Sequence, residues 1–127
     1  MILIIGGAHQ GKLEYALSTG QGLSVYQCSL DDIDVDYSCD IINSAHSLIL
    51  ALMRSGISPE AYFADHIADL TGKIIVIDDI TSGVVPIDAE MRLWRDNTGR
   101  AMGFLSKHAD RVVRVFCGIA TTLKPQA

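Results

Sequence analysis

The N-terminal end of the chain joins a short apolar strand to a glycine-rich loop, and this feature limits the possible folds most. Residues Met1 to Ile5 are apolar without interruption, which is typical of a strand buried on both faces of a parallel sheet. The run ends at Gly6, and Gly11 and Lys12 follow at the spacing of a phosphate-binding loop. We therefore predict an α/β fold of the P-loop nucleotide-binding type, with a mostly parallel sheet and helices on both faces.

Each part of this loop has a physical role in holding phosphate. Glycines allow the backbone to curl, so that several N–H groups point at one anion. A helix that begins near Gly11 adds the positive end of its dipole, and Lys12 adds a mobile positive charge. The alternative is a glycine-rich turn between a core strand and a core helix. The predicted nucleotide-binding residues are Gly6, Gly7, Ala8, His9, Gln10, Gly11, Lys12 and Leu13.

The loop lacks one part that magnesium binding uses. A Ser or Thr normally follows the lysine and ligates Mg²⁺, whereas this chain has Leu13. A second apolar run, from Ile74 to Ile77, ends in Asp78 and Asp79. Such a carboxylate emerges at the carboxyl end of a parallel sheet, where the ligand binds. We predict a weakened magnesium site with Asp78 and Asp79 as its ligands; the alternative is that one of them caps the next turn.

The bulk composition excludes several classes of protein. The chain is 49% apolar and 20% charged, which is ordinary for an α/β protein. Its net charge of −5 and its lack of a basic run argue against duplex nucleic acid or an anionic membrane as a partner. The longest apolar stretch, Leu48 to Met53, is too short for a membrane span, and no signal peptide is evident. We expect one cytoplasmic domain over residues 1–127.

Two groups of side chains are expected to be structural. Cys28, Cys39 and Cys117 lack metal-ligand spacing, and buried reduced thiols are expected. Four aspartates between residues 31 and 36 are expected to form a solvated loop. The alternative, a cation site, lacks the glycine and the distal glutamate of a calcium loop.

Strands and helices are expected to alternate along the chain. Asp40 precedes the second helix and either caps it or ends a short strand over 37–39, while Ser58 and Asp88 are N-cap candidates. His46 lies at the edge of the apolar face of that helix and is expected to pack there. The periodicity predicts helices over 12–18, 41–53, 59–70 and 89–107, strands over 23–28, 73–79 and 111–117, and a tail over 118–124.

Several motifs of the second half resemble those of a known family. Residues 79–86 begin with an acid, contain a glycine and end in Val-Pro. Two further segments follow at a specific spacing, Arg92 to Asp96 and Gly99-Arg100. Residues 108–112, 118–119 and 123–124 and the loop from Gly6 to Lys12 fit the same pattern. This pattern resembles the bifunctional adenosylcobinamide kinase / adenosylcobinamide-phosphate guanylyltransferase of cobalamin synthesis.

The resemblance implies a function as well as a fold. It implies ATP or GTP as the nucleotide, a corrinoid as the second substrate, phosphoryl transfer to a hydroxyl, and Lys12 and Asp79 as catalytic residues. The alternative is a non-catalytic nucleotide-binding sensor or partner protein derived from the same family, a reading that Leu13 favours. A homo-oligomer is compatible with either.

One segment of the family pattern is missing. The family carries the histidine that takes up GMP between its second strand and the following helix, where this chain has only the acidic loop. No histidine lies between His9 and His46, and the residues around His46 do not match the family motif. The resemblance therefore does not extend to guanylyltransferase activity.

We predict that this chain forms no GMP–histidine intermediate. A histidine carries a nucleotidyl group only when a neutral ring nitrogen lies in line with the α-phosphorus, and the segment that would place it is absent. Incubation with GTP labelled in the α-phosphate, followed by denaturation at alkaline pH, should leave the protein unlabelled. Stoichiometric label that disappears in His46→Ala would contradict the prediction.

Overall fold

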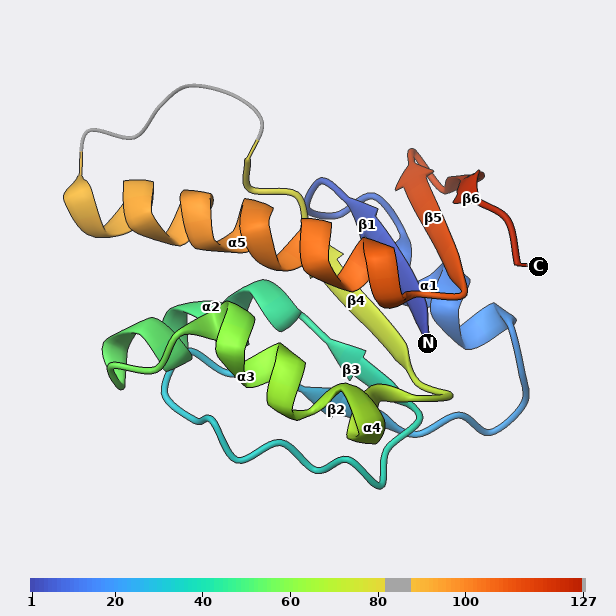
Figure 1. The fold of residues 1–127 in the computed structure, drawn as a ribbon. Helices are drawn as coiled ribbons and strands as arrows, with labels where there is room; N and C mark the ends of the chain where they lie inside the picture. Colours follow the sequence, from blue (N-terminus) through green and yellow to red (C-terminus); the bar gives the residue numbers. More distant parts are fainter. Residues whose placement is uncertain (82–87, 127) are drawn as a thin grey trace.

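The three-dimensional structure of the chain, a computed structural model, describes residues 1–81 and 88–126. Within these residues six strands form one sheet in the order β2-β3-β4-β1-β5-β6 (Figure 1). Neighbouring strands are parallel except for the antiparallel pair β5 and β6, so the predicted mostly parallel sheet is confirmed. The strands are β1 (Ile2–Gly6), β2 (Val25–Gln27), β3 (Ile41–Asn43), β4 (Ile74–Asp78), β5 (Arg111–Phe116) and β6 (Ile119–Lys124).

Helices cover both faces of the sheet, as predicted. One face packs against α1 (Lys12–Ser18), which contributes Leu13 and Ala16. The other face is covered by four helices, of which α5 is the longest and lies across α2 and α3 (Figure 1). These helices are α2 (Ala45–Arg54), α3 (Pro59–Asp65), α4 (Ile67–Leu70) and α5 (Ala89–His108).

The two central strands are buried on both faces, which explains their uninterrupted apolar sequences. In β1, Leu3 joins the cluster beneath α2 and α5, while Ile4 joins the cluster beneath α1, and both are 0% exposed. In β4, Ile75 and Val76 divide between the same two clusters. Successive side chains of a strand point to opposite faces, so each strand contributes to both cores.

The prediction of a single helix over residues 41–53 is wrong. Ile41 and Ile42, 0% and 2% exposed, belong to β3, and α2 begins only at Ala45. In a position between β2 and β4, the ladder hydrogen bonds and the burial of both residues outweigh the helical periodicity. Asp40 caps no helix, because its Oδ2 accepts hydrogen bonds from the N–H (2.8 Å) and the hydroxyl (3.0 Å) of Ser24.

Two further expectations need correction. Residues 119–124 of the expected tail form the edge strand β6, which pairs with β5. The helix expected over 59–70 is interrupted at His66, between α3 and α4. The predicted caps are confirmed, since Ser58 Oγ accepts from Ala61 N–H at 3.4 Å and Asp88 Oδ1 accepts from Met91 N–H at 3.1 Å.

The structural side chains behave mostly as expected. All three cysteines are free, but only Cys28 is buried, and burial raises the pKa of its thiol to about 12; Cys39 is half-buried and Cys117 is exposed. The four aspartates of the acidic loop are exposed. In residues 1–81 and 88–126, no three His, Cys, Asp or Glu side chains are grouped to hold a metal ion. Over the same described residues, no helix is both long and apolar enough to cross a bilayer.

Candidate functional site

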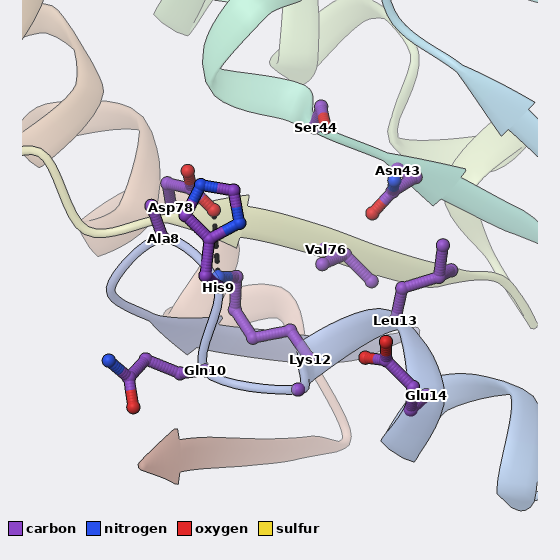
Figure 2. A pocket seen from close by; sticks show the side chains of 11 residues that line it. Ala8, His9, Gln10, Lys12, Leu13, Glu14, Asn43, Ser44, Val76 and Asp78 are labelled. Carbon is purple, nitrogen blue, oxygen red and sulfur yellow. Dashed lines mark ion pairs between the residues drawn. The ribbon is translucent and has the colours of Figure 1, made fainter. Parts of the chain in front are cut away.

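Parallel pairing of β1 with β4 brings the glycine-rich loop (residues 7–11) next to the end of β4. Gly6 is in register with Asp78, and Asp79 N–H donates to the Gly6 carbonyl at 2.8 Å. A cavity of about 290 Å³ opens at this edge of the sheet (Figure 2). Its walls are residues 8–14, the residues Asn43 and Ser44 at the end of β3, and Val76 and Asp78 of β4.

Lys12 places a nearly buried positive charge beside this cavity. The residue is 6% exposed, and its Nζ lies 2.7 Å from Asp78 Oδ1, the ion pair drawn in Figure 2. The same ammonium donates a hydrogen bond to the Gly7 carbonyl. A charge removed from water is costly unless it is paired and hydrogen-bonded, so Asp78 and Gly7 compensate Lys12 when no anionic ligand is bound.

His46 completes the cluster on the other side of Asp78. Its Nδ1 accepts a hydrogen bond from Asp78 N–H at 3.0 Å, and its Nε2 lies 3.4 Å from Asp78 Oδ2. Burial lowers the pKa of His46 below its usual value, and the Asp78 carboxylate only partly opposes this shift. The expectation that His46 only packs is therefore incomplete, because its ring also contacts the carboxylate at the cavity.

Asp79 takes the arrangement that the sequence left open as an alternative. Its Oδ1 accepts hydrogen bonds from the N–H of Thr81 at 3.0 Å and from the Thr81 hydroxyl. It therefore caps the turn after β4, and it is not among the residues that line the cavity. Of the two predicted metal ligands, Asp78 is the one beside Lys12.

The glycine-rich loop is hydrogen-bonded to the hairpin formed by β5 and β6. Cys117 N–H donates to the side-chain Oε1 of Gln10 at 2.7 Å, and Gly118 N–H donates to the Gln10 carbonyl at 2.9 Å. A Cβ atom at Gly11 would lie 3.4 Å from the Cα of Gly118. The hairpin thus fixes the side of the loop that faces away from the ion pair.

Left-handed backbone conformations gather around the same cavity. Among the described residues, His9, Ser44 and Cys117 are the non-glycine residues with positive φ, at 59°, 58° and 50°. His9 and Ser44 line the cavity, and Cys117 is bonded to the loop. Such conformations persist where surrounding contacts over-determine the backbone, and they concentrate at functional sites.

The structure brings most of the predicted loop residues together at the cavity. Residues 8–13 line it, whereas Gly6 and Gly7 are not among its lining residues. The Gly6 carbonyl accepts from Asp79 N–H, and the Gly7 carbonyl accepts from the Lys12 ammonium. The predicted site did not include Glu14, Asn43, Ser44 or His46. Glu14 directly follows the predicted loop. Asn43 ends β3, and Ser44 and His46 come just after it; because the sequence predicts helix over these residues, it does not indicate their place at the carboxyl edge of the sheet.

Residues 47–123 match the family model described as cobinamide kinase / cobinamide phosphate guanyltransferase. The chain belongs to this family. The predicted resemblance is thereby confirmed, together with the α/β fold of P-loop type. The matched region includes β4, α5 and the β5–β6 hairpin, and it begins one residue after His46, so it does not include the glycine-rich loop. Residues 82–86 of the family motif lie outside the described residues. A comparison with curated proteins gave no match.

Gly6→Ala should destabilise the fold. A Cβ at Gly6, where φ is 156°, would collide with the Val115 carbonyl oxygen of the adjacent strand, and overpacking of this kind costs about 1–3 kcal/mol. Urea unfolding measures the change. Gly103→Ala is the matched control, because a Cβ there meets no atom within 4 Å and alanine in a helix gains roughly 0.5–1 kcal/mol over glycine. Equal stability of the two variants would contradict the close approach at Gly6.

Proposed function

We propose that this chain binds ATP or GTP at the cavity and transfers a phosphoryl group to a hydroxyl of a corrinoid in cobalamin biosynthesis. The observation that carries the proposal is the nearly buried Lys12 ammonium, which lies beside the cavity at the end of a glycine-rich loop. Membership of the cobinamide kinase family supports the reaction and the substrate class.

The loop and Lys12 would hold the nucleotide. Residues 6–13 surround the point where the phosphates would lie, and α1 begins at Lys12 with its positive end toward the cavity. Because Lys12 is paired with Asp78, an incoming phosphate must replace the Asp78 carboxylate as the ion-pair partner of the Lys12 ammonium. Nucleotide binding would therefore release Asp78 Oδ1 at the edge of the cavity.

The donor set fits magnesium only in part. Asp78 offers a carboxylate at the cavity, which suits a hard cation. Leu13 offers no oxygen; its side chain lines the cavity and packs against the apolar cluster beneath α1. Asp79 is engaged with Thr81, so we propose Asp78 as the principal protein ligand and Asp79 as a support of the turn. Magnesium, when bound, would neutralise charge on the outer phosphates.

The chemistry asked of the protein is positioning and charge stabilisation. In phosphoryl transfer the attacking and leaving oxygens lie roughly in line, and little covalent chemistry falls to the protein. Lys12 would stabilise the charge that develops on the transferred group, and the loop amides would fix its position. Guanylyl transfer is not part of the proposal, because the family's histidine segment is missing.

We also propose a cytoplasmic location, no nucleic-acid or membrane partner, and one domain that is able to form homo-oligomers.

A non-catalytic role in nucleotide sensing is the second candidate. The observation that favours it is Leu13, which removes a magnesium ligand from an otherwise matching loop. The two candidates differ in one measurement: an active kinase transfers the γ-phosphate of ATP or GTP to adenosylcobinamide. A sensor binds the nucleotide and leaves the corrinoid unmodified.

Lys12→Ala should weaken nucleotide binding about 10- to 100-fold, which is the loss expected for one charge-assisted hydrogen bond. Titration calorimetry with ATP and with GTP measures it. Lys107→Ala is the matched control, because Lys107 is an exposed lysine at the end of α5. Binding that is equal in wild type and Lys12→Ala, or absent from both, would refute the proposal.

Magnesium should strengthen nucleotide binding only modestly in the wild type, and Leu13→Ser should enlarge this effect by supplying the missing hydroxyl. The measured quantity is the ratio of the nucleotide Kd without and with Mg²⁺. Leu17→Ser tests the same substitution at an exposed position of α1, with 40% of the leucine accessible, and should leave the ratio unchanged. Strong magnesium dependence that survives both Asp78→Ala and Asp79→Ala would overturn the assigned metal site.

A further inference from the structure

A second cavity lies between the turn after β4 and the middle of α5. Its volume is about 590 Å³, and it is lined by Thr81, Arg95, Asp96, Gly99 and Arg100. It shares no lining residue with the cavity at the glycine-rich loop. Small-molecule sites commonly measure about 300–1,000 Å³, so this cavity has room for a compound larger than a single ion.

The turn after β4 approaches α5 closely at Gly99. A Cβ atom at Gly99 would lie 3.2 Å from Cγ2 of Thr81, which is a tight contact. Thr81 is itself held in place, because its N–H and its hydroxyl both donate hydrogen bonds to Asp79 Oδ1. Asp79, which does not line the first cavity, therefore supports one wall of the second.

Two arginines of α5 bring positive charge to this cavity. Arg95 is half-buried and Arg100 is exposed. In residues 1–81 and 88–126, neither guanidinium has an ion pair with an acidic side chain. Asp96 precedes Arg100 by four residues, a spacing at which ion pairs form on helices, yet these two side chains are not paired. Because the chain as a whole carries a net charge of −5, the two unpaired arginines are not part of a generally basic surface.

The chemistry of two guanidinium groups suits a phosphate group. Each guanidinium presents its N–H groups in a fixed planar fork that matches two oxygens of a phosphate. A phosphate monoester carries up to two negative charges at neutral pH, which Arg95 and Arg100 together would neutralise. An anion at these arginines would also leave Lys12 free to act at the glycine-rich loop.

The second cavity is close to the first along the chain. Thr81 follows Asp78 by three residues, and an extended chain covers at most about 11 Å over that distance. Asp78 lines the first cavity and Thr81 lines the second. Ligands in the two cavities would therefore be separated by one short turn.

We propose that this cavity is a second anion site, in which Arg95 and Arg100 bind the phosphate group of a phosphorylated small molecule. The glycine-rich loop is not part of it. Two sources share this chemistry, namely a nucleotide and the phosphate ester that the proposed transfer forms. Only the second source rests on the proposed function.

Binding of inorganic phosphate tests the site directly. The experiment uses Lys12→Ala, in which the loop cavity lacks its ammonium, and follows the arginine Nε–H signals by NMR at constant ionic strength. The signals of Arg95 and Arg100 should shift on one saturable curve. A curve that is missing from either arginine, or that chloride reproduces, would overturn the proposal.

Substitution of each arginine measures its share of the binding. Arg95→Gln and Arg100→Gln should each weaken phosphate binding at least tenfold, the loss expected for a charge-assisted hydrogen bond. Arg54→Gln is the matched control, because Arg54 is an exposed arginine paired with Glu90 at 2.8 Å, and it should leave the Kd unchanged. Thermal unfolding verifies that each variant is folded. Equal binding before and after either substitution at the cavity would contradict the proposal.

Competition against inorganic phosphate distinguishes the two sources. In Lys12→Ala, displacement of phosphate from the arginines by AMP identifies a nucleotide, and tighter displacement by cobinamide phosphate identifies the product. If neither compound competes, the cavity binds an adventitious ion only and the proposal is refuted. A wild type that binds AMP at the arginines but transfers no phosphoryl group would refute the proposed kinase and support this inference.

Discussion

The contact between Lys12 and Asp78 is the interaction on which the site depends. A lysine that is 6% exposed requires a counter-charge, and the carboxylate 2.7 Å away supplies it. The two residues are 66 positions apart in the sequence, and they meet only because β1 and β4 are parallel neighbours. The same pairing sets Gly6 against Asp78, so the start of the loop and the acid are aligned by backbone hydrogen bonds.

Around this pair, each neighbouring element restrains one side of the cavity. Two backbone N–H groups of the β5–β6 hairpin donate hydrogen bonds to Gln10 of the loop. His46, in the first turn of α2, contacts the Asp78 carboxylate. Trp94 of α5 then fixes the backbone of His46. The residues that contact Lys12 and Asp78 are therefore supported by elements from both halves of the chain.

Leu13, which stands where a phosphate-binding loop normally has Ser or Thr, has a structural explanation. Leu13 packs against the cluster beneath α1, the short helix that covers the second face of the sheet. A seven-residue helix buries few side chains, among them Ala16, so an additional apolar contact from its first turn favours its attachment. The same side chain stands where a phosphate-binding loop normally has a hydroxyl, so the weaker magnesium binding that we propose would accompany firmer packing of α1.

The sequence by itself determined the features that depend on local chemistry. The uninterrupted apolar runs of β1 and β4 indicated a parallel sheet, the spacing of Gly6, Gly11 and Lys12 indicated the loop, and Ser58 and Asp88 marked two helix starts. The motifs of the second half also indicated the family. Each of these signals lies within a few consecutive residues or follows a fixed spacing.

Only the tertiary structure decided the features that depend on strand order. It made residues 41–43 a strand, because a position between β2 and β4 outweighs their helical periodicity. It placed the Asp78 side chain at the cavity, beside Lys12, and the Asp79 side chain in the turn after β4. The two differ because adjacent side chains of an extended chain point to opposite sides, so only one of the two acids can face Lys12. It also placed His46 beside Asp78, through the adjacency of β3 and β4, which no local pattern in either segment records.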